Sequence, residues 1–344
     1  MATTTVPART ARHAGGLAIG VLLLAGLLAV TAFVSITLGS RSMTLTTIID
    51  AFAQFDPDSA AHKVIRDMRM PRTLIGVTVG VALGLAGALL QGATRNPLAD
   101  PGIMGINAGA AAFVVFGIMV LGVQSISVYV WFAFAGAAVA TVLVYGVASF
   151  GREGATPVKL ALAGAAVTAG LQAFTSGVVM TNVDALNELR FWQVGSLAGR
   201  YSPVLSQVLP FIIVGAVLAL ILARSLNGLA LGDDVARSLG QRVAVSRGLM
   251  FVAVAILSGA ATAACGPIVF LGLVVPHLAR MICGPDYRWI LPYCVLLTPI
   301  LLLAADIAGR IVGSPGELQV GVVIGVIGAP LFVLLVRYRN ITEL

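Results

Sequence analysis

Eight stretches of the chain contain no Asp, Glu, Lys or Arg, and the longest of them, Pro101–Gly151, runs for 51 residues. The hydrocarbon core of a bilayer is ~30 Å thick, and a helix rising ~1.5 Å per residue crosses it in ~20 apolar residues. Pro101–Gly151 is therefore long enough for two spans. Because no water satisfies backbone groups inside a bilayer, each span must be a helix bonded to itself. The sequence predicts an all-α, polytopic membrane protein.

Most of the other charge-free stretches have the length of one span. The exception is Gly248–Ala279, whose 32 residues contain Gly266-Pro267, a pair that interrupts a helix. We expect two shorter helices there, about Leu249–Ala264 and Ile268–Ile282, which brings the total to about ten transmembrane helices. The remaining stretches are Ala14–Ser40, Thr73–Thr94, Leu160–Val183, Tyr201–Ala223, Trp289–Ala305 and Leu318–Val336. An apolar content of 59% disfavours buried core helices of a soluble protein.

No long polar segment separates the spans, so residues 1–344 are expected to form a single transmembrane domain. The sequence contains no GxxxxGK[ST] phosphate loop, which predicts that any ATP hydrolysis takes place in another chain. We expect Gly15–Leu38 to be a retained helix, because no small-residue cleavage site follows it. The three cysteines lack CxxC spacing and are expected to pack in the core, which predicts no disulfide, metal site or cofactor in this chain.

The distribution of basic residues predicts the orientation. Ten spans place both termini on one side; if that side is cytoplasmic, 13 of the 21 Lys and Arg residues lie inside and eight outside. Basic residues favour the cytoplasmic side, so we expect both termini there, and we attribute the net charge of +7 to these loops rather than to nucleic-acid binding. Four outside residues, Lys63, Arg66, Arg69 and Arg72, precede one span within ten residues. Either the topology differs there, or the outer face carries positive charge that docks an acidic partner.

Small residues recur every four positions in the second predicted span. On a helix they form one smooth ridge, and such ridges let neighbouring helices approach closely in lipid. We therefore expect tight packing along Gly76, Gly80, Gly84, Ala88 and Gly92.

The segment that follows this span, Gln91–Gly102, is rich in proline and glycine. Irregular backbone at membrane depth is tolerated only inside protein or beside a water-filled cavity. A simple cytoplasmic turn is the alternative. We predict that the segment borders a translocation pathway, with Gln91, Asn96, Pro97 and Asn107 as the candidate wall residues.

Residues 225–247 form the longest polar stretch between two spans, and we expect them to be a cytoplasmic loop. Leu231–Gly240 within it is expected to be a short helix, with acidic residues in its first turn and Gly240 at its end. Val235, Ala236 and Leu239 are expected to form an exposed apolar face that docks into a partner's groove. A solvated loop is the alternative.

Asp306 and Arg310 stand four residues apart near the outer end of the ninth span. A lone charge beside lipid is costly, and i,i+4 residues face each other on a helix. The spacing predicts a structural ion pair between them.

Several long motifs in this chain resemble those of the FecCD family of permease subunits, which serve bacterial ATP-binding-cassette (ABC) importers for iron-siderophores, haem and cobalamin. Within that family the chain is most similar to the D subunits of ferric enterobactin permeases. The segments that match the family are Arg69–Arg72, Gly84–Gly87, Gln91, Arg95–Ala110, Phe191–Leu197, Leu231–Gly240, Gly266–Leu273, Pro276–Arg280, Ala305–Arg310 and Pro315–Leu318. The similarity to the D subunits is carried by Arg95–Ala110, Leu189–Leu197 and Ser225–Gly232.

The resemblance implies a type II ABC importer permease in the bacterial cytoplasmic (inner) membrane, without an ATPase of its own. Its partners would be a second permease subunit, two ATPase subunits that bind ATP and Mg²⁺, and an external substrate-binding protein. A permease heterodimer is favoured and a homodimer is possible. The implied cargo is an iron-siderophore, with a catecholate of the enterobactin type favoured and haem or cobalamin as alternatives.

The resemblance also assigns roles to particular residues. It implies that Arg69, Arg72 and Arg310, assisted by Arg66, dock the binding protein. It implies that Leu231, Gly232, Ala236, Leu239 and Gly240 contact the ATPase subunit, and that the fifth and last spans supply further pathway walls. The rival from another class is an ion-coupled secondary transporter, which would need an intramembrane carboxylate such as Asp306.

Overall fold

The computed structural model describes residues 14–39, 43–122, 125–150, 156–181 and 183–338. Its described part is helical, with no strand. The basic residues Arg9, Arg12, Arg41, Arg152 and Arg339, which entered the prediction of orientation, lie outside the described residues.

Ten apolar helices correspond one to one to the predicted spans. Seven of them are long and apolar enough to cross a bilayer, and the other three are shorter. The ten are α1 (Ala14–Thr37), α4 (Met70–Thr94), α5 (Ile106–Leu121), α6 (Ile126–Ser149), α7 (Pro157–Thr181), α9 (Ser202–Ile221), α12 (Val243–Cys265), α13 (Leu271–Cys283), α14 (Tyr287–Val312) and α15 (Val320–Tyr338).

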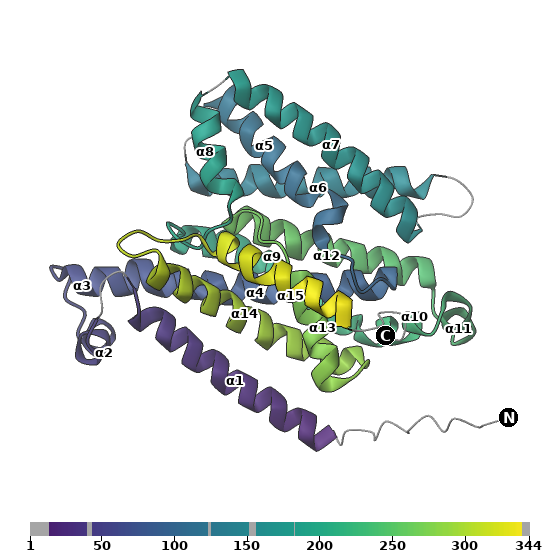
Figure 1. Ribbon diagram of the computed structural model, residues 1–344, viewed down its shortest axis with the longest axis horizontal. Helices are drawn as coiled ribbons and strands as arrows, with labels where there is room; N and C mark the ends of the chain where they lie inside the picture. Colours follow the sequence, from purple (N-terminus) through teal and green to yellow (C-terminus); the bar gives the residue numbers. More distant parts are fainter. Residues whose placement is uncertain (1–13, 40–42, 123–124, 151–155, 182, 339–344) are drawn as a thin grey trace.

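Figure 1 shows these helices lying side by side along one long direction of the molecule. Helices α5, α6 and α7 form one side with α8 (Val183–Gln193), and α4, α9 and α12 form the middle. Helices α13, α14 and α15 follow, and α1 lies at the opposite edge, packed on α14.

Short helices mark the two ends of the bundle. Helices α2 (Leu45–Ala53) and α3 (Ala60–Lys63) lie at one end, here called the α3 end. Helices α10 (Ala223–Ala230) and α11 (Asp233–Ser238) lie at the other, here called the α11 end. Helix α1 begins and α15 finishes at the α11 end, so the described chain starts and finishes at the same end of the bundle (Figure 1).

Helix α4 is the centre of the bundle, and nearly all of its residues from Val79 to Thr94 are buried. Its small residues face two neighbours across the middle layer. On the predicted ridge, a Cβ atom on Gly80 would lie 2.6 Å from Pro299 Cα of α14; outside that ridge, one on Gly87 would overlap the Gly272 carbonyl oxygen of α13. The predicted ridge is therefore a packing surface, because any side chain there would push these helices apart.

The predicted break at Gly266-Pro267 is confirmed. Helix α12 finishes at Cys265 and α13 begins at Leu271, and the residues between them are not helical. Part of their backbone bonding comes from the segment after α8, because Ser196 N–H donates to the Cys265 carbonyl at 2.8 Å. Gly266 has φ +75°, and a Cβ there would overlap the Trp192 carbonyl oxygen. The break is thus held inside protein, as irregular backbone at this depth requires.

Two boundaries differ from the sequence-based expectation. The charged residues before the second span are not a loop: α3, a π-helical segment at Val64–Arg69 and α4 form one continuous helix from Ala60 to Thr94. The last span begins at Val320, and Glu317 precedes it in an extended connection. Both differences matter for the site, because they place arginines and a carboxylate beside one another.

Candidate functional site

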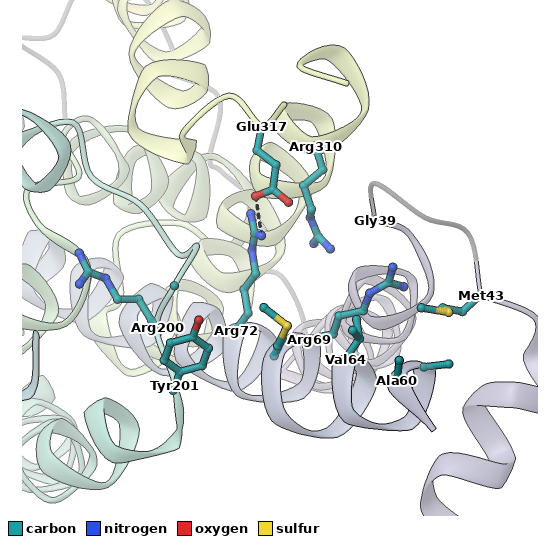
Figure 2. Close-up of a pocket in the computed structure, with 13 residues that line it drawn as sticks. Gly39, Met43, Ala60, Val64, Arg69, Arg72, Arg200, Tyr201, Arg310 and Glu317 are labelled. Carbon is teal, nitrogen blue, oxygen red and sulfur yellow. Dashed lines mark hydrogen bonds and ion pairs between the residues drawn. The ribbon is translucent and has the colours of Figure 1, made fainter. Parts of the chain in front are cut away.

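An open pocket of about 530 Å³ lies at the α3 end of the bundle. Its charged lining comes from three parts of the chain that are far apart in sequence: the start of α4, the end of α14 with the connection to α15, and the turn before α9 (Figure 2). The charged side chains are Arg69, Arg72, Arg200, Arg310 and Glu317.

Arg72 is the central bridging group of this pocket. Its Nη2 and Nε donate to the two carboxylate oxygens of Asp306 at 2.7 and 3.0 Å, and its Nη1 donates to Glu317 Oε2 at 2.7 Å. A planar guanidinium suits this arrangement because it can hold one carboxylate with two parallel bonds and keep a third donor for another. Arg72 thereby joins α4 to α14 and to the start of the α15 segment.

Asp306 is 1% exposed and is shared by two arginines. Arg310 Nη2 lies 2.9 Å from Asp306 Oδ2, which is the i,i+4 pair that the spacing predicts. Arg310 also donates to the carbonyls of Ser35 and Leu38 at 2.8 and 2.6 Å. The pair is therefore part of a larger buried network, and Arg72 is the member that sequence spacing does not reveal.

Arg69 binds the end of the first span. Its Nη1 donates to the carbonyls of Ile36 and Thr37 at 2.9 and 2.8 Å. The last carbonyls of a helix carry partial negative charge and no intrahelical partner, so a buried cation is well placed there. Arg69 and Arg310 together secure the end of α1 to α4 and α14.

The four arginines expected to dock a partner are not equivalent. Arg69, Arg72 and Arg310 line the pocket and are mostly buried, whereas Arg66 is exposed and its guanidinium lies 4.7 Å from the centre of the Phe55 ring. Arg66 is not among the residues that line this pocket. The docking role of all four stays a prediction.

Arg200 is a pocket residue that the sequence-based reasoning did not select. It was among the basic residues placed outside by the orientation prediction, and that count is the signal that could have found it. The side chain is buried, and burial lowers the pKa of Arg200. Its guanidinium points away from Arg72 in Figure 2. The pocket region contains four arginines (Arg69, Arg72, Arg200 and Arg310) and two carboxylates (Asp306 and Glu317). Its net charge is therefore +2.

At the α11 end, the short helix expected within Leu231–Gly240 is present as α11, Asp233–Ser238. Gly232, with φ +112°, and Gly240, with φ +81°, flank it in backbone conformations that favour glycine. The expected apolar face is wrong in one residue. Ala236 is fully buried against the rest of the chain, whereas Leu231, Val235 and Leu239 are exposed. The face available to a partner is therefore made by these three side chains.

The candidate pathway residues do not form one site within this chain. Gln91 is buried: its Nε2 donates to the Leu273 carbonyl at 3.0 Å, and its Oε1 accepts from Arg280 at 2.6 Å. Asn96 is exposed in the turn after α4, next to half-buried Pro97. Asn107 accepts from Thr262 Oγ1 at 3.1 Å near the start of α5. The segment is therefore buried at Gln91 and exposed at Asn96, and its place beside a pathway stays a prediction.

These features define the class of the molecule. A bundle of ten apolar helices, with a charged pocket at one end and a short helix with exposed apolar side chains at the other, is an integral membrane protein that offers distinct surfaces on its two sides. Residues 27–338 match the FecCD transport family, so the chain belongs to that family and the resemblance seen in its motifs is confirmed.

Individual relatives agree over nearly the whole chain. It is 46% identical to the ferric enterobactin transport system permease protein FepD of Escherichia coli (strain K12), over 91% of this chain and 93% of that protein. It is 42% identical to the probable siderophore transport system permease protein YfiZ of Bacillus subtilis (strain 168), over 88% of this chain and 91% of that protein. A solved structure described as an inward-facing metal-chelate type ABC transporter is 28% identical, with a TM-score of 0.79 over 93% of this chain and 99% of that one.

The chain is therefore a permease subunit of a type II ABC importer and not an ion-coupled secondary transporter. Permeases of this family have no ATPase of their own and work with ATPase and substrate-binding partners, in which ATP hydrolysis and substrate capture take place.

Proposed function

We propose that this subunit imports an iron-siderophore across the cytoplasmic membrane of a bacterium, with a catecholate of the enterobactin type as the favoured cargo. The observation that carries the proposal is the 46% identity to FepD over nearly the full length of both chains. Haem and cobalamin are the alternative cargoes within the family.

The test is uptake of radiolabelled ferric enterobactin by cells that lack all other FecCD permease genes and express this chain together with its partner permease, ATPase and binding-protein subunits. Uptake that depends on ATP and is outcompeted by unlabelled ferric catecholate, but not by a ferric hydroxamate, haem or cobalamin, is the expected result. Uptake of cobalamin or haem in preference to any ferric siderophore would contradict it.

We further propose that the α11 end faces the cytoplasm, where α11 contacts an ATPase subunit through Leu231, Val235 and Leu239. The α3 end then faces outward and receives the binding protein at its arginine pocket. A second permease subunit would complete the pathway beside α7 and α15. A heterodimer with a related chain is favoured over a homodimer. Helices α7 and α15 both leave much of their surface exposed in this chain, which supports such an interface.

The orientation can be tested with single cysteines, because Cys265, Cys283 and Cys294 are all buried. Asp56→Cys at the α3 end should react with a membrane-impermeant maleimide in intact cells lacking an outer membrane barrier. Ser238→Cys on α11 should react only after the membrane is opened. Labelling of Ser238→Cys from outside would reverse the orientation.

The proposed docking pocket predicts a specific effect of Glu317. This carboxylate is 33% exposed and accepts a hydrogen bond from Arg72 Nη1. It therefore competes with any carboxylate that a binding protein brings to Arg72. Glu317→Gln raises the positive charge of the pocket by one and should accelerate association at low ionic strength, because steering of charged partners depends on the local field and is screened by salt.

The measurement is the association rate of the binding protein with the permease complex in lipid nanodiscs, across a salt series. Glu317→Gln should associate faster at low salt, and the difference should vanish at about 1 M salt, where the Debye length is only ~3 Å. Asp58→Asn, which removes an exposed carboxylate at the same end but outside the pocket, is the matched control. Equal rates for Glu317→Gln and the control at every salt concentration would place the docking site elsewhere.

A further inference from the structure

One carboxylate at the α11 end is shared by two arginines from separate transmembrane helices. Asp233, the first residue of α11, accepts at Oδ1 from Arg95 Nη2 and from Arg247 Nη2, the latter at 3.0 Å. Arg95 directly follows α4, and Arg247 lies in the first turns of α12. Asp233 therefore joins three helices at one point.

Arg95 connects this contact to the segment between α4 and α5. Arg95 is the residue directly after α4, and it caps that helix in a left-handed conformation with φ +49°. Its backbone N–H still bonds to the last turn of α4, and the chain after it turns into the Asn96–Gly105 segment that leads to α5. A displacement of the Arg95 side chain would therefore move the junction between the end of α4 and the Asn96–Gly105 segment.

Helix α10, which precedes α11, is attached to the bundle independently of Asp233. It is fixed to the start of α14, because Asn227 Nδ2 donates to Asp286 Oδ1 at 2.6 Å and Asn227 Oδ1 accepts from Tyr287 N–H at 2.8 Å. Gly232 separates α10 from α11 in a conformation of positive φ. Ala236 is buried against the rest of the chain, and Asp233 forms ion pairs with Arg95 at the end of α4 and with Arg247 of α12.

The neighbouring residue supplies a contrast. Asp234 is 98% exposed and pairs with Arg237 of its own helix at 2.8 Å. The two adjacent carboxylates therefore differ in their ion pairs: Asp233 is partly buried and pairs with arginines outside α11, whereas the ion pair of exposed Asp234 lies within its own helix.

We propose that Asp233 is the positioning residue that transmits movement of α11 to the end of α4 and the segment after it. The guanidinium groups of Arg95 and Arg247 would repel each other without the Asp233 carboxylate that both of them bind. The three side chains therefore move together when α11 is displaced. The inference rests on the proposed contact between α11 and an ATPase subunit. Chains of ion pairs and packed helices can carry coupling between distant sites, and Asp233 supplies such a contact between α11, the end of α4 and α12.

The test uses the complete importer in proteoliposomes: permease subunits, ATPase subunits and binding protein. The readouts are basal ATP hydrolysis, its stimulation by loaded binding protein, and uptake. Asp233→Asn keeps the shape of the side chain but removes its charge. Coupling free energies between sites typically correspond to about 5- to 150-fold effects, so we expect the stimulated rate to fall by at least about fivefold. Basal hydrolysis and the amount of ATPase bound should be unchanged.

Asp234→Asn is the matched control and should behave as the unmodified chain does. Asp233→Glu, which restores the charge, should recover stimulation in part, whereas a loss of fold alone would not be repaired by it. Full stimulation in Asp233→Asn, or equal losses in Asp233→Asn and Asp234→Asn, would overturn the inference.

The proposed function itself is tested separately by Leu239→Glu, which alters the exposed face of α11. If Leu239→Glu leaves ATPase binding intact, α11 is not the contact, and the inference about Asp233 is overturned with it. If Leu239→Glu releases the ATPase while Asp233→Asn retains full stimulation, the contact stands and only the role of Asp233 is wrong.

Discussion

Asp306→Asn should lower the free energy of unfolding of this subunit by about 3–5 kcal/mol, because breaking a buried ion pair from one side leaves uncompensated charge. Asp306 is almost fully buried and neutralises both Arg72 and Arg310. The measurement is thermal unfolding of the purified chain in detergent, followed by size-exclusion chromatography of the surviving fraction.

Glu317→Gln is the matched control for Asp306. It removes the other carboxylate bound to Arg72, but Glu317 is one-third exposed, and exposed pairs contribute about 0–1 kcal/mol. The double variant Asp306→Leu, Arg72→Met should recover only part of the lost stability, since it removes Arg72 together with Asp306 but leaves Arg310 without its carboxylate partner. An Asp306→Asn chain as stable as the unmodified one would show that the network is not structural.

Leu239→Glu should release the ATPase subunit while the permease stays folded. Leu231 and Leu239 flank α11 and are about two-thirds exposed, at 65% and 64%, and apolar side chains at the centre of an interface cost about 2 kcal/mol or more when they are removed. That energy corresponds to about a 30-fold weaker complex. Co-purification of tagged permease with the ATPase subunits, at several detergent-to-protein ratios, measures the loss.

Ala236→Arg should act differently, because Ala236 is buried within this chain. An arginine there forces α11 away from the bundle and leaves a charge without water, so the expected result is an unstable permease rather than a folded one that cannot dock. Arg237→Gln, which changes an exposed residue of the same helix, is the control for both variants and should leave ATPase binding within twofold of normal, or about 0.4 kcal/mol. ATPase binding unaffected by Leu239→Glu would contradict the docking surface.

The transmembrane architecture follows directly from the sequence. A span is defined by composition, since roughly 20 residues without charge must satisfy their own backbone, and that requirement acts on each segment separately. The ten spans, the break at Gly266-Pro267 and the small-residue ridge of α4 could all be read for this reason. The i,i+4 spacing of Asp306 and Arg310 is equally local, and the two side chains do meet.

The partners of the charged side chains were decided by the tertiary structure. Arg72 and Asp306 are 234 positions apart, and nothing in either local sequence selects the other. They meet because the glycine ridge lets α4 pack closely on α14. The same holds for Arg69, which binds carbonyls of α1, and for Asp233, which meets Arg95 and Arg247 only after three helices converge.

The burial of Ala236 is another property that the local sequence does not reveal. Periodicity places Ala236 beside Val235 and Leu239 on an apolar face, but it cannot tell which part of that face the chain itself covers. The sequence by itself determined how many helices cross the membrane and where they break, because those properties depend on short-range backbone and solvation requirements. Only the packed bundle decided which charges pair and which apolar side chains are left for a partner, because these depend on distances between helices that no local pattern encodes.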